Sequence, residues 1–184
     1  MPKSDLQGQL LVAKPSILGD PSFHRAVVLL AQKNNESALG FILNKPLDIT
    51  LDTLLPEIET SFPVFYGGPV DPDNLFYIHN QGDHIQNSIS IDDHWYWGGD
   101  FEDVVSKIQT QQLHPENIRF FMGYSGWAKD QLEEEMNTES WLVVSLPEEN
   151  ILAMDPQAIW PKILYSLGGE YQVWANSPDN PNYN

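Results

Sequence analysis

Residues 118–145, IRFFMGYSGWAKDQLEEEMNTESWLVVS, hold the pattern that decides the fold. The apolar run at 118–122 predicts a buried strand, and the glycines of GYSGW at 123–127 predict a tight turn. Residues 129–136 have the spacing of an amphipathic helix, and SWLVVS at 140–145 predicts another strand. Strand, turn, helix and strand therefore follow one another within 28 residues.

Two helices are indicated by the spacing of their apolar residues. The segment after Asp100, FEDVVSKIQTQQL, repeats apolar residues at helical intervals, and Asp100 is a suitable N-cap with Asp103 three residues later. In the helix at 129–136, the three glutamates at 133–135 are expected to form a solvated face.

The amino-terminal third predicts a β-hairpin. Two apolar runs, at 26–32 and 38–43, are separated by the polar cluster at 33–37. The second strand is expected to end at Asn44-Lys45-Pro46, because proline cannot donate to a β-ladder.

The remaining elements are shorter. Gly67-Gly68-Pro69 ends one strand at a backbone bend that glycine makes easily. Further strands are expected at 10–13, 64–66, 75–79 and 88–91, and further helices after Thr50 and Asp155. Hairpins early in the chain and alternating helices and strands later predict an α+β (mixed α/β) fold. We expect one domain over residues 1–175 and a flexible C-terminal tail over the Asn- and Pro-rich residues 176–184.

Composition limits the function. The chain has 26 acidic and 9 basic residues and a net charge of −17, and its basic residues are scattered along the sequence. Direct nucleic-acid binding is therefore disfavoured, because it depends on clustered lysine and arginine. The absence of cysteine excludes disulfides and thiolate metal sites. No signal peptide is recognisable and the longest aliphatic run is too short for a membrane span, so we expect a cytoplasmic protein.

Ser125 is a candidate nucleophile because it lies between two glycines. A nucleophile elbow has the pattern G-x-S-x-G, but here Trp127 occupies the position of the second glycine. The sequence also gives no reason to pair Ser125 with a particular histidine. A structural turn with Ser125 as helix cap is the preferred interpretation.

The same segment could bind an anion. A glycine loop that leads into a helix presents free N–H groups at the positive end of the helix dipole. The segment lacks the G-K-[ST] ending of a P-loop and the spacing of a dinucleotide fold. An anion site at 123–127 is thus an alternative to a purely structural turn.

Histidines and aspartates gather at two nearby places. His79 and His84 occur in HNQGDH, and His94 ends DDH. Imidazole and carboxylate ligands suit zinc, iron or manganese, but no compact metalloenzyme spacing is present. Polar residues at strand ends are the simpler explanation, and no metal or cofactor is expected.

The order of motifs resembles the YqgE/AlgH family of bacterial proteins. The matching segments are GDPSFHRAVVLL, ALGFILNKP, FYGGPV, LFYIH, GYSGW with QLEEE, WLVV and LGG at 167–169. They cover almost the whole chain in the expected order. The chain departs from the usual pattern in AQKNNES at 31–37 and in GWAKDQLE at 126–133.

The resemblance implies a strongly bent, partly barrel-like mixed sheet surrounded by helices. Members are labelled transcriptional regulators after a protein linked to alginate production, and the resemblance implies no reaction, cofactor or catalytic residue.

Three classes of function follow from these observations. We expect a non-enzymatic regulatory protein that binds an unidentified protein or small molecule through Gly67, Gly68, Pro69, His79, Gly123, Ser125, Gly126 and Trp127. Direct DNA binding fits the regulator label but not the charge. The enzyme alternative is a hydrolase or metal-dependent activity that uses Ser125 or the group His79, His84 and His94.

Overall fold

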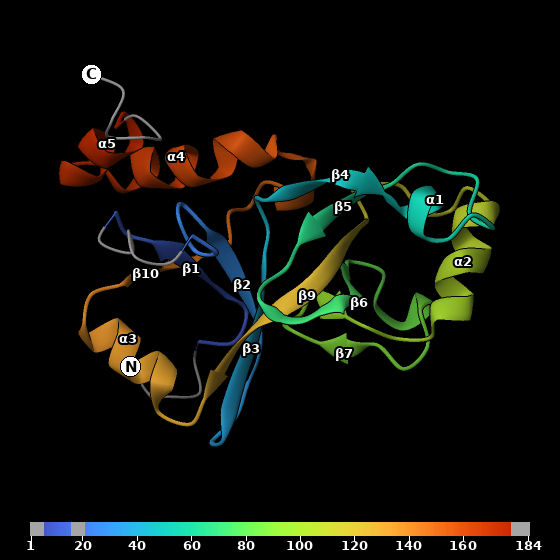
Figure 1. Ribbon diagram of the computed structural model, residues 1–184, viewed down its shortest axis with the longest axis horizontal. Coiled ribbons are helices and arrows are strands. Elements are labelled where there is room, and N and C mark those ends of the chain that lie inside the picture. Colours follow the sequence, from blue (N-terminus) through green and yellow to red (C-terminus); the bar gives the residue numbers. More distant parts are fainter. Residues whose placement is uncertain (1–5, 16–20, 178–184) are drawn as a thin grey trace.

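The computed structural model describes residues 6–15 and 21–177. In this part of the chain there are ten strands and five α-helices, and Figure 1 shows the helices around a bent sheet. The strands are β1 (Gln9–Ala13), β2 (Val27–Lys33), β3 (Ser37–Ile42), β4 (Pro46–Thr50), β5 (Pro63–Tyr66), β6 (Val70–His79), β7 (Ile89–Ser90), β8 (Tyr96–Trp97), β9 (Ile118–Ala128) and β10 (Trp141–Ser145). The helices are α1 (Leu51–Leu54), α2 (Phe101–Gln109), α3 (Gln131–Asn137), α4 (Pro156–Leu167) and α5 (Glu170–Ala175).

Strand β9 joins the two halves of the sheet. The strand order is β10-β1-β2-β3-β9-β6-β8-β7, and β5 pairs with both β4 and β9. The first half of β9 lies between β6 and the parallel strand β5, whereas its second half pairs with β3 from Ser125 to Ala128. The predicted fold class, α+β with a strongly bent, partly barrel-like sheet surrounded by helices, is confirmed.

Three clusters of buried apolar side chains lie on the faces of this sheet. One cluster contains Trp160 and its neighbours on α4 together with residues of β1, β2 and β3. Helix α3 contributes Leu132 to the second cluster, on the opposite face of the same strands. Helices α1 and α2 cover the third cluster, around Phe120 of β9. Alternate residues of β1 and β2 enter the first and second clusters, as the two-residue period of a strand requires.

The hairpin and the helix caps agree with the sequence. Strands β2 and β3 pair antiparallel, with a register shift between Leu30 and Gln32. Asp100 and Asp155 each accept a backbone N–H from the residue two positions later, at 3.0 Å. Asp103 does not complete a capping box, because its carboxylate accepts from the amide of Gln86 instead.

Other local predictions are met only in part. The strand predicted at 88–91 is reduced to β7, which pairs with the unpredicted β8 and not with β6. Strand β4 and helix α5 were also not predicted. Helix α4 begins at Pro156 and continues through Pro161. Of the predicted tail at 176–184, residues 178–184 lie outside the described part of the chain.

The largest correction concerns GYSGW. The chain does not turn there, because β9 continues as a strand to Ala128. Ladder pairing with β3 through Ser125, Gly126 and Trp127 holds this extension in place. The backbone departs from regular geometry only at Gly123, where φ is +71°. Tertiary pairing has therefore overridden the local turn preference of the glycines.

Candidate functional site

The two glycine segments predicted to form a binding surface lie side by side. The amide of Gly67 donates to the carbonyl of Met122 at 2.9 Å. A Cβ atom at Gly68 would lie 2.3 Å from the carbonyl group of Tyr124, and one at Gly123 would lie 2.4 Å from the carbonyl oxygen of Gly68. The glycines thus allow two backbones to touch where β5 gives way to β6, and Gly67, Gly68 and Gly123 are buried there. Their binding role stays a prediction.

Ser125 is buried in the middle of β9. Its Oγ atom donates to the carbonyl of Gly67 at 3.0 Å, and its side chain has no exposed surface. Helix α3 begins only at Gln131, so Ser125 is not a helix cap and the glycines do not form an anion cradle at a helix start. The geometry gives no support to the nucleophile hypothesis, since this hydroxyl is buried and donates to a backbone carbonyl rather than to a histidine.

The His79 side chain is buried and forms hydrogen bonds within the protein. Its ring is fully buried, Nδ1 accepts from the amide of Gln81 at 3.2 Å, and Nε2 donates to the carbonyl of Gly98 at 3.1 Å. Ser88 Oγ lies 3.1 Å from the same Nε2 atom. Burial lowers the pKa of His79, whereas the bond to Gly98 acts in the opposite direction. The neutral imidazole therefore joins β6 to the loop after β8.

The predicted group of three histidines is not assembled. His84 and His94 line a groove of about 890 Å³ between the loops at 80–84, 92–96 and 146–150, and His79 is not among its lining residues. Within residues 6–15 and 21–177, no three His, Asp or Glu side chains are arranged to hold a metal ion. The geometry thus gives no support to the metal-dependent alternative.

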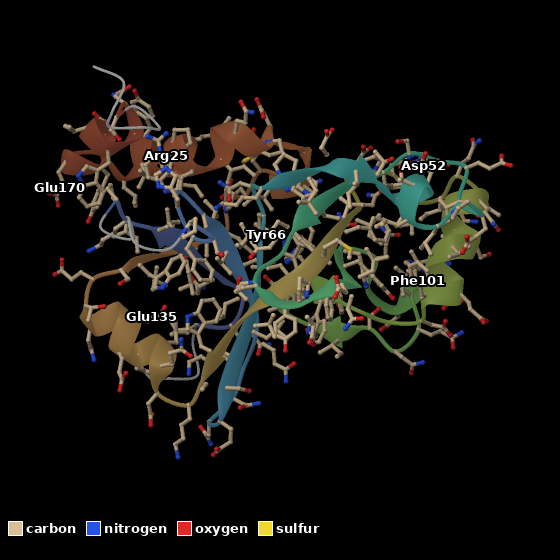
Figure 2. The ribbon with its side chains drawn as sticks, in the orientation of Figure 1. Arg25, Asp52, Tyr66, Phe101, Glu135 and Glu170 are labelled. Atoms are coloured by element: carbon tan, nitrogen blue, oxygen red, sulfur yellow. The ribbon has the colours of Figure 1, made fainter. Side chains whose placement is uncertain are left out.

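A shared carboxylate joins α3 to the strands β9 and β10. The indole N–H groups of Trp127 and Trp141 both donate to Oε2 of Glu135 at 2.9 Å, and Gln131 donates to Oε1 at 3.1 Å. Phe23 packs against both indoles. Glu135, labelled in Figure 2, is therefore not part of a solvated face as the sequence suggested. In the sequence, only the spacing could have indicated this contact: Glu135 lies eight residues after Trp127 and six residues before Trp141.

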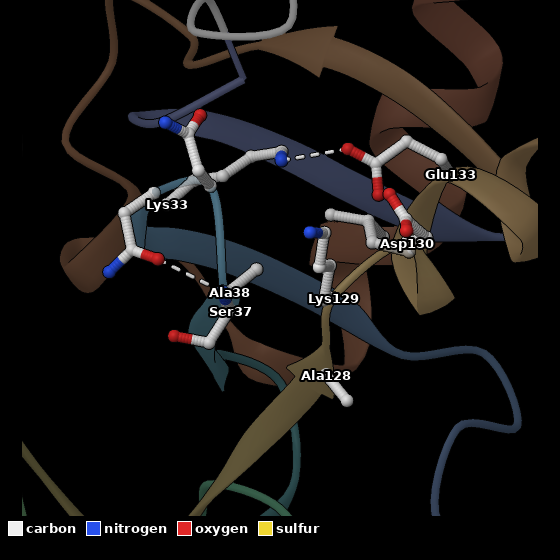
Figure 3. A pocket seen from close by; sticks show the side chains of 10 residues that line it. Lys33, Ser37, Ala38, Ala128, Lys129, Asp130 and Glu133 are labelled. Atoms are coloured by element: carbon white, nitrogen blue, oxygen red, sulfur yellow. Dashed lines mark hydrogen bonds and ion pairs between the residues drawn. The ribbon is translucent and has the colours of Figure 1, made fainter.

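A polar cavity opens directly beyond Trp127. We call it the hairpin cavity, because it lies between the tip of the β2–β3 hairpin and the beginning of α3 (Figure 3). Its volume is about 430 Å³, within the usual range for small-molecule sites. It is lined by residues 33–35, 37, 38, 128–130, 132 and 133.

Local sequence shapes both walls of the hairpin cavity. On one side, Asn34 Oδ1 accepts the amides of Glu36 and Ser37 at 2.8 and 2.9 Å, which fixes the hairpin tip. On the other side, Asp130 has a left-handed backbone with φ of +63°, which turns the chain from β9 into α3. The Asn34 hydrogen bonds and the left-handed conformation of Asp130 thus fix the backbone on the two sides of the cavity.

The charges in the hairpin cavity are of both signs. Lys33 forms an ion pair with Glu133 at 2.8 Å, and its side chain is only 9% exposed. Lys129 forms no ion pair with a carboxylate in the described chain and extends into the space between Lys33 and Asp130 (Figure 3). Ammonium, amide and hydroxyl donors therefore face two carboxylates across a small space. Such convergence of polar groups is typical of a binding site.

A second cavity, of about 430 Å³, is mostly apolar. It is lined by Leu55, Leu75, Phe76, Tyr77, Trp97, Gly98, Gly99 and Phe101, the last of which is labelled in Figure 2. The phenol of Tyr77 donates to the carbonyl of Gly99 at 2.7 Å, and burial raises its pKa to about 12. The phenol is thus already bonded within the protein, whereas the buried indole N–H of Trp97 has no hydrogen-bond partner among the described residues.

Comparison with known proteins identifies the family. Residues 10–172 match the family model described as AlgH-like. The chain belongs to the AlgH-like family. A UPF0301 protein of Cytophaga hutchinsonii is 41% identical over 97% of this chain and 98% of the relative. A UPF0301 protein of Chlorobium limicola is 38% identical over 96% of this chain and 95% of the relative.

Solved structures show the same fold as this AlgH-like chain. The solution structure of the AlgH protein from Pseudomonas aeruginosa has a TM-score of 0.73 and 24% identity, covering 97% of this chain and 96% of the other. The crystal structure of DIP2367 from Corynebacterium diphtheriae has a TM-score of 0.75 and 20% identity, covering 94% and 92%. The names of these relatives state no reaction or ligand.

The hairpin cavity is formed by the two segments in which this chain differs from the motifs that it otherwise resembles. The segments AQKNNES at 31–37 and GWAKDQLE at 126–133, far apart in sequence, supply all its lining residues except Ala38. The sequence thus marked both segments as unusual but gave no reason to place them together. Separately, no helix among the described residues is both long and apolar enough to cross a bilayer.

Proposed function

We propose that this protein is a non-enzymatic cytoplasmic regulator that acts by binding a small polar ligand in the hairpin cavity. The observation that carries the proposal is the nearly buried Lys33 side chain, which forms an ion pair with Glu133 at 2.8 Å. It lies beside Lys129, which forms no ion pair with any of the described residues. The cavity begins one residue after Trp127, so the proposed site adjoins the surface predicted from the sequence. The transcriptional-regulator label of the family fits such a ligand sensor.

The chemistry of the cavity defines the class of ligand. Lys33 and Lys129 provide positive charge for an acidic group, and Asp130 and Glu133 provide acceptors for hydroxyl or ammonium donors. A ligand with only negative charge would meet these two carboxylates and a chain of net charge −17. The proposed ligands are therefore small zwitterions or hydroxy acids.

The experiment is a titration followed by amide chemical shifts. The ¹⁵N-labelled protein is titrated with individual amino acids and hydroxy acids at millimolar concentration. Saturable shifts confined to the amides of residues 33–38 and 128–133 are the expected result. Lys129→Glu should weaken the binding because it replaces a donor with a repelling charge, whereas Lys107→Glu makes the same charge change on α2, outside this cavity. If no compound shifts these amides, or if both variants weaken binding equally, the proposal is wrong.

Direct DNA contact is the competing regulatory mechanism. The 26 acidic residues give the chain a net charge of −17, which opposes the counterion release on which DNA affinity depends. A regulator of this composition is better explained by ligand or protein binding. A mobility-shift assay with promoter DNA at physiological salt should show no complex. A sequence-specific complex that weakens steeply with salt would establish the competing mechanism.

A further inference from the structure

Strand β10 forms one edge of the sheet. In the described part of the chain it pairs only with β1, in a continuous antiparallel register from Gln9↔Ser145 to Ala13↔Trp141. Figure 1 shows β10 as the outermost strand beyond β1, between α3 and α4. Its sequence, WLVVS, is apolar and regular, and Val143 is 36% exposed.

The hydrogen-bond pattern shows which backbone groups face outward. The amide of Ala13 donates to Ala26 on the β2 side, and the amide of Lys14 donates to Ser140 on the β10 side. Backbone groups alternate along an antiparallel strand, so residues at even positions, such as Leu142 and Val144, bond to β1. The N–H and C=O groups of Trp141, Val143 and Ser145 therefore face away from the sheet.

Within the described residues, the edge at β7 and β6 is protected against strand addition, whereas β10 is not. Strand β7 has only two residues. The projecting part of β6 carries Pro72 between two aspartates, with a register shift from Val70 to Leu75. Short strands, prolines, charges and bulges are the usual means of preventing strand addition. None of these features occurs in β10.

We propose that β10 is a docking edge for an extended, basic segment of a partner protein, which adds a strand next to Val143. Unpaired N–H and C=O groups at every second residue fit an extended peptide backbone. The exposed Glu139 and Glu148 lie beyond the two ends of β10, within a chain of net charge −17. Glu139 also forms an ion pair with Lys14 at 3.3 Å, so Glu148 is the stronger attraction for a basic segment. A segment with β-branched residues between lysines or arginines complements both the edge and these charges.

A second copy of the chain is a poorer occupant. Antiparallel self-pairing centred on Val143 would bring Glu139 of one copy towards Glu148 of the other. It would also bring together two chains that each carry a net charge of −17. Charge therefore favours a basic partner over a homodimer.

The test uses the full-length ¹⁵N-labelled protein and a capped heptapeptide in which valine and threonine alternate between terminal lysines. The amides of Val143 and Ser145 should shift on titration and become protected from hydrogen exchange, while those of Leu142 and Val144 are protected already. A peptide with glutamate in place of lysine should bind at least about tenfold more weakly, because it repels the acidic ends of the edge.

Two variants locate the contact. Val143→Pro removes an outward N–H without breaking the β1–β10 ladder, and proline is tolerated on edge strands, so peptide binding should be lost. Val143→Thr retains that N–H group and a β-branched side chain, so binding should persist. Amide shifts outside residues 141–145, or no shifts at all, would overturn the proposal. This outcome is measured on the unaltered protein, so it does not depend on whether the Val143→Pro variant folds. A third outcome is that the protein binds no peptide but forms concentration-dependent dimers, which the Val143→Pro substitution dissociates. This result would show that a second copy occupies the edge, and it would also overturn the proposal.

Discussion

The hydroxyl of Ser125 donates to the carbonyl oxygen of Gly67 at 3.0 Å, and this bond joins β9 to the segment that follows β5. The same oxygen accepts the amide of Ile42 at 3.0 Å. One carbonyl thus connects β3, β9 and the crossing from β5 to β6. The residue that most resembled a catalytic nucleophile in the sequence is therefore part of the sheet.

Ser125→Ala should lower the free energy of unfolding by about 1 kcal/mol, the net contribution of one hydrogen bond. The loss stays small because Gly67 keeps its bond from Ile42 and is not left without a donor. Urea unfolding measures the change. A loss of several kcal/mol would show that the hydroxyl has a further role, and ligand binding in the hairpin cavity should be unaltered.

Gly68→Ala should destabilise the protein by more than about 3 kcal/mol or prevent folding, because overpacking at a rigid site is not relieved. Its new Cβ atom would lie 2.3 Å from the carbonyl group of Tyr124, and φ is +152°. Gly98→Ala is the matched control, since φ is +64° and no atom lies within 4 Å of the new Cβ. Gly98→Ala should lower the free energy of unfolding by only about 1 kcal/mol, because an alanine in a left-handed backbone conformation is strained. Thermal unfolding of both variants compares them, and equal losses would contradict the close contact.

The sequence predicts elements that are set by local chemistry. The periodic helix after Asp100, its cap and the β2–β3 hairpin each depend on residues within a few positions of one another. The fold class follows from the order of these elements and from the family resemblance. Strand β8 has only two residues and pairs with β6 and β7. It is therefore too short to show the alternation of apolar and polar residues by which a strand is predicted.

The candidate site was less predictable, because it depends on contacts distant in sequence. Lys33 meets Glu133 across 100 positions, and no local pattern indicates that these two residues pair. The glycines of GYSGW suggested a loop, but the ladder with β3 extends the strand through them. A local pattern could show that this region is unusual and could not show which side chains meet there.

Glu135→Ala should destabilise the protein by about 3 kcal/mol, because it leaves two buried indole N–H groups without their acceptor. Glu135→Gln should cost less, since its amide oxygen can still accept from one or both indoles. Glu134→Ala, at an exposed neighbouring position on α3, should change stability by less than about 0.5 kcal/mol. Urea unfolding followed by tryptophan fluorescence measures all three variants. Equal stability of the Glu135→Ala and Glu134→Ala proteins would show that the shared carboxylate does not stabilise α3.

His79 should make stability depend on pH. Burial holds its folded pKa below the unfolded value of 6.5, so between these two values the unfolded chain binds a proton that the folded chain does not. The contribution of the neutral imidazole to the free energy of unfolding is therefore complete above pH 6.5. It is lost progressively as the pH falls from 6.5 towards the folded pKa.

Urea midpoints measured between pH 5 and pH 8 test this dependence. His79→Gln should be less stable at pH 8, because it loses the buried hydrogen bonds to Gln81 and Gly98, and its midpoint should vary less with pH. His114→Gln, at an exposed position, should retain the pH dependence of the unaltered protein. If the His79→Gln and unaltered proteins lose stability in parallel as the pH falls, another group is responsible and His79 is not held neutral by the fold.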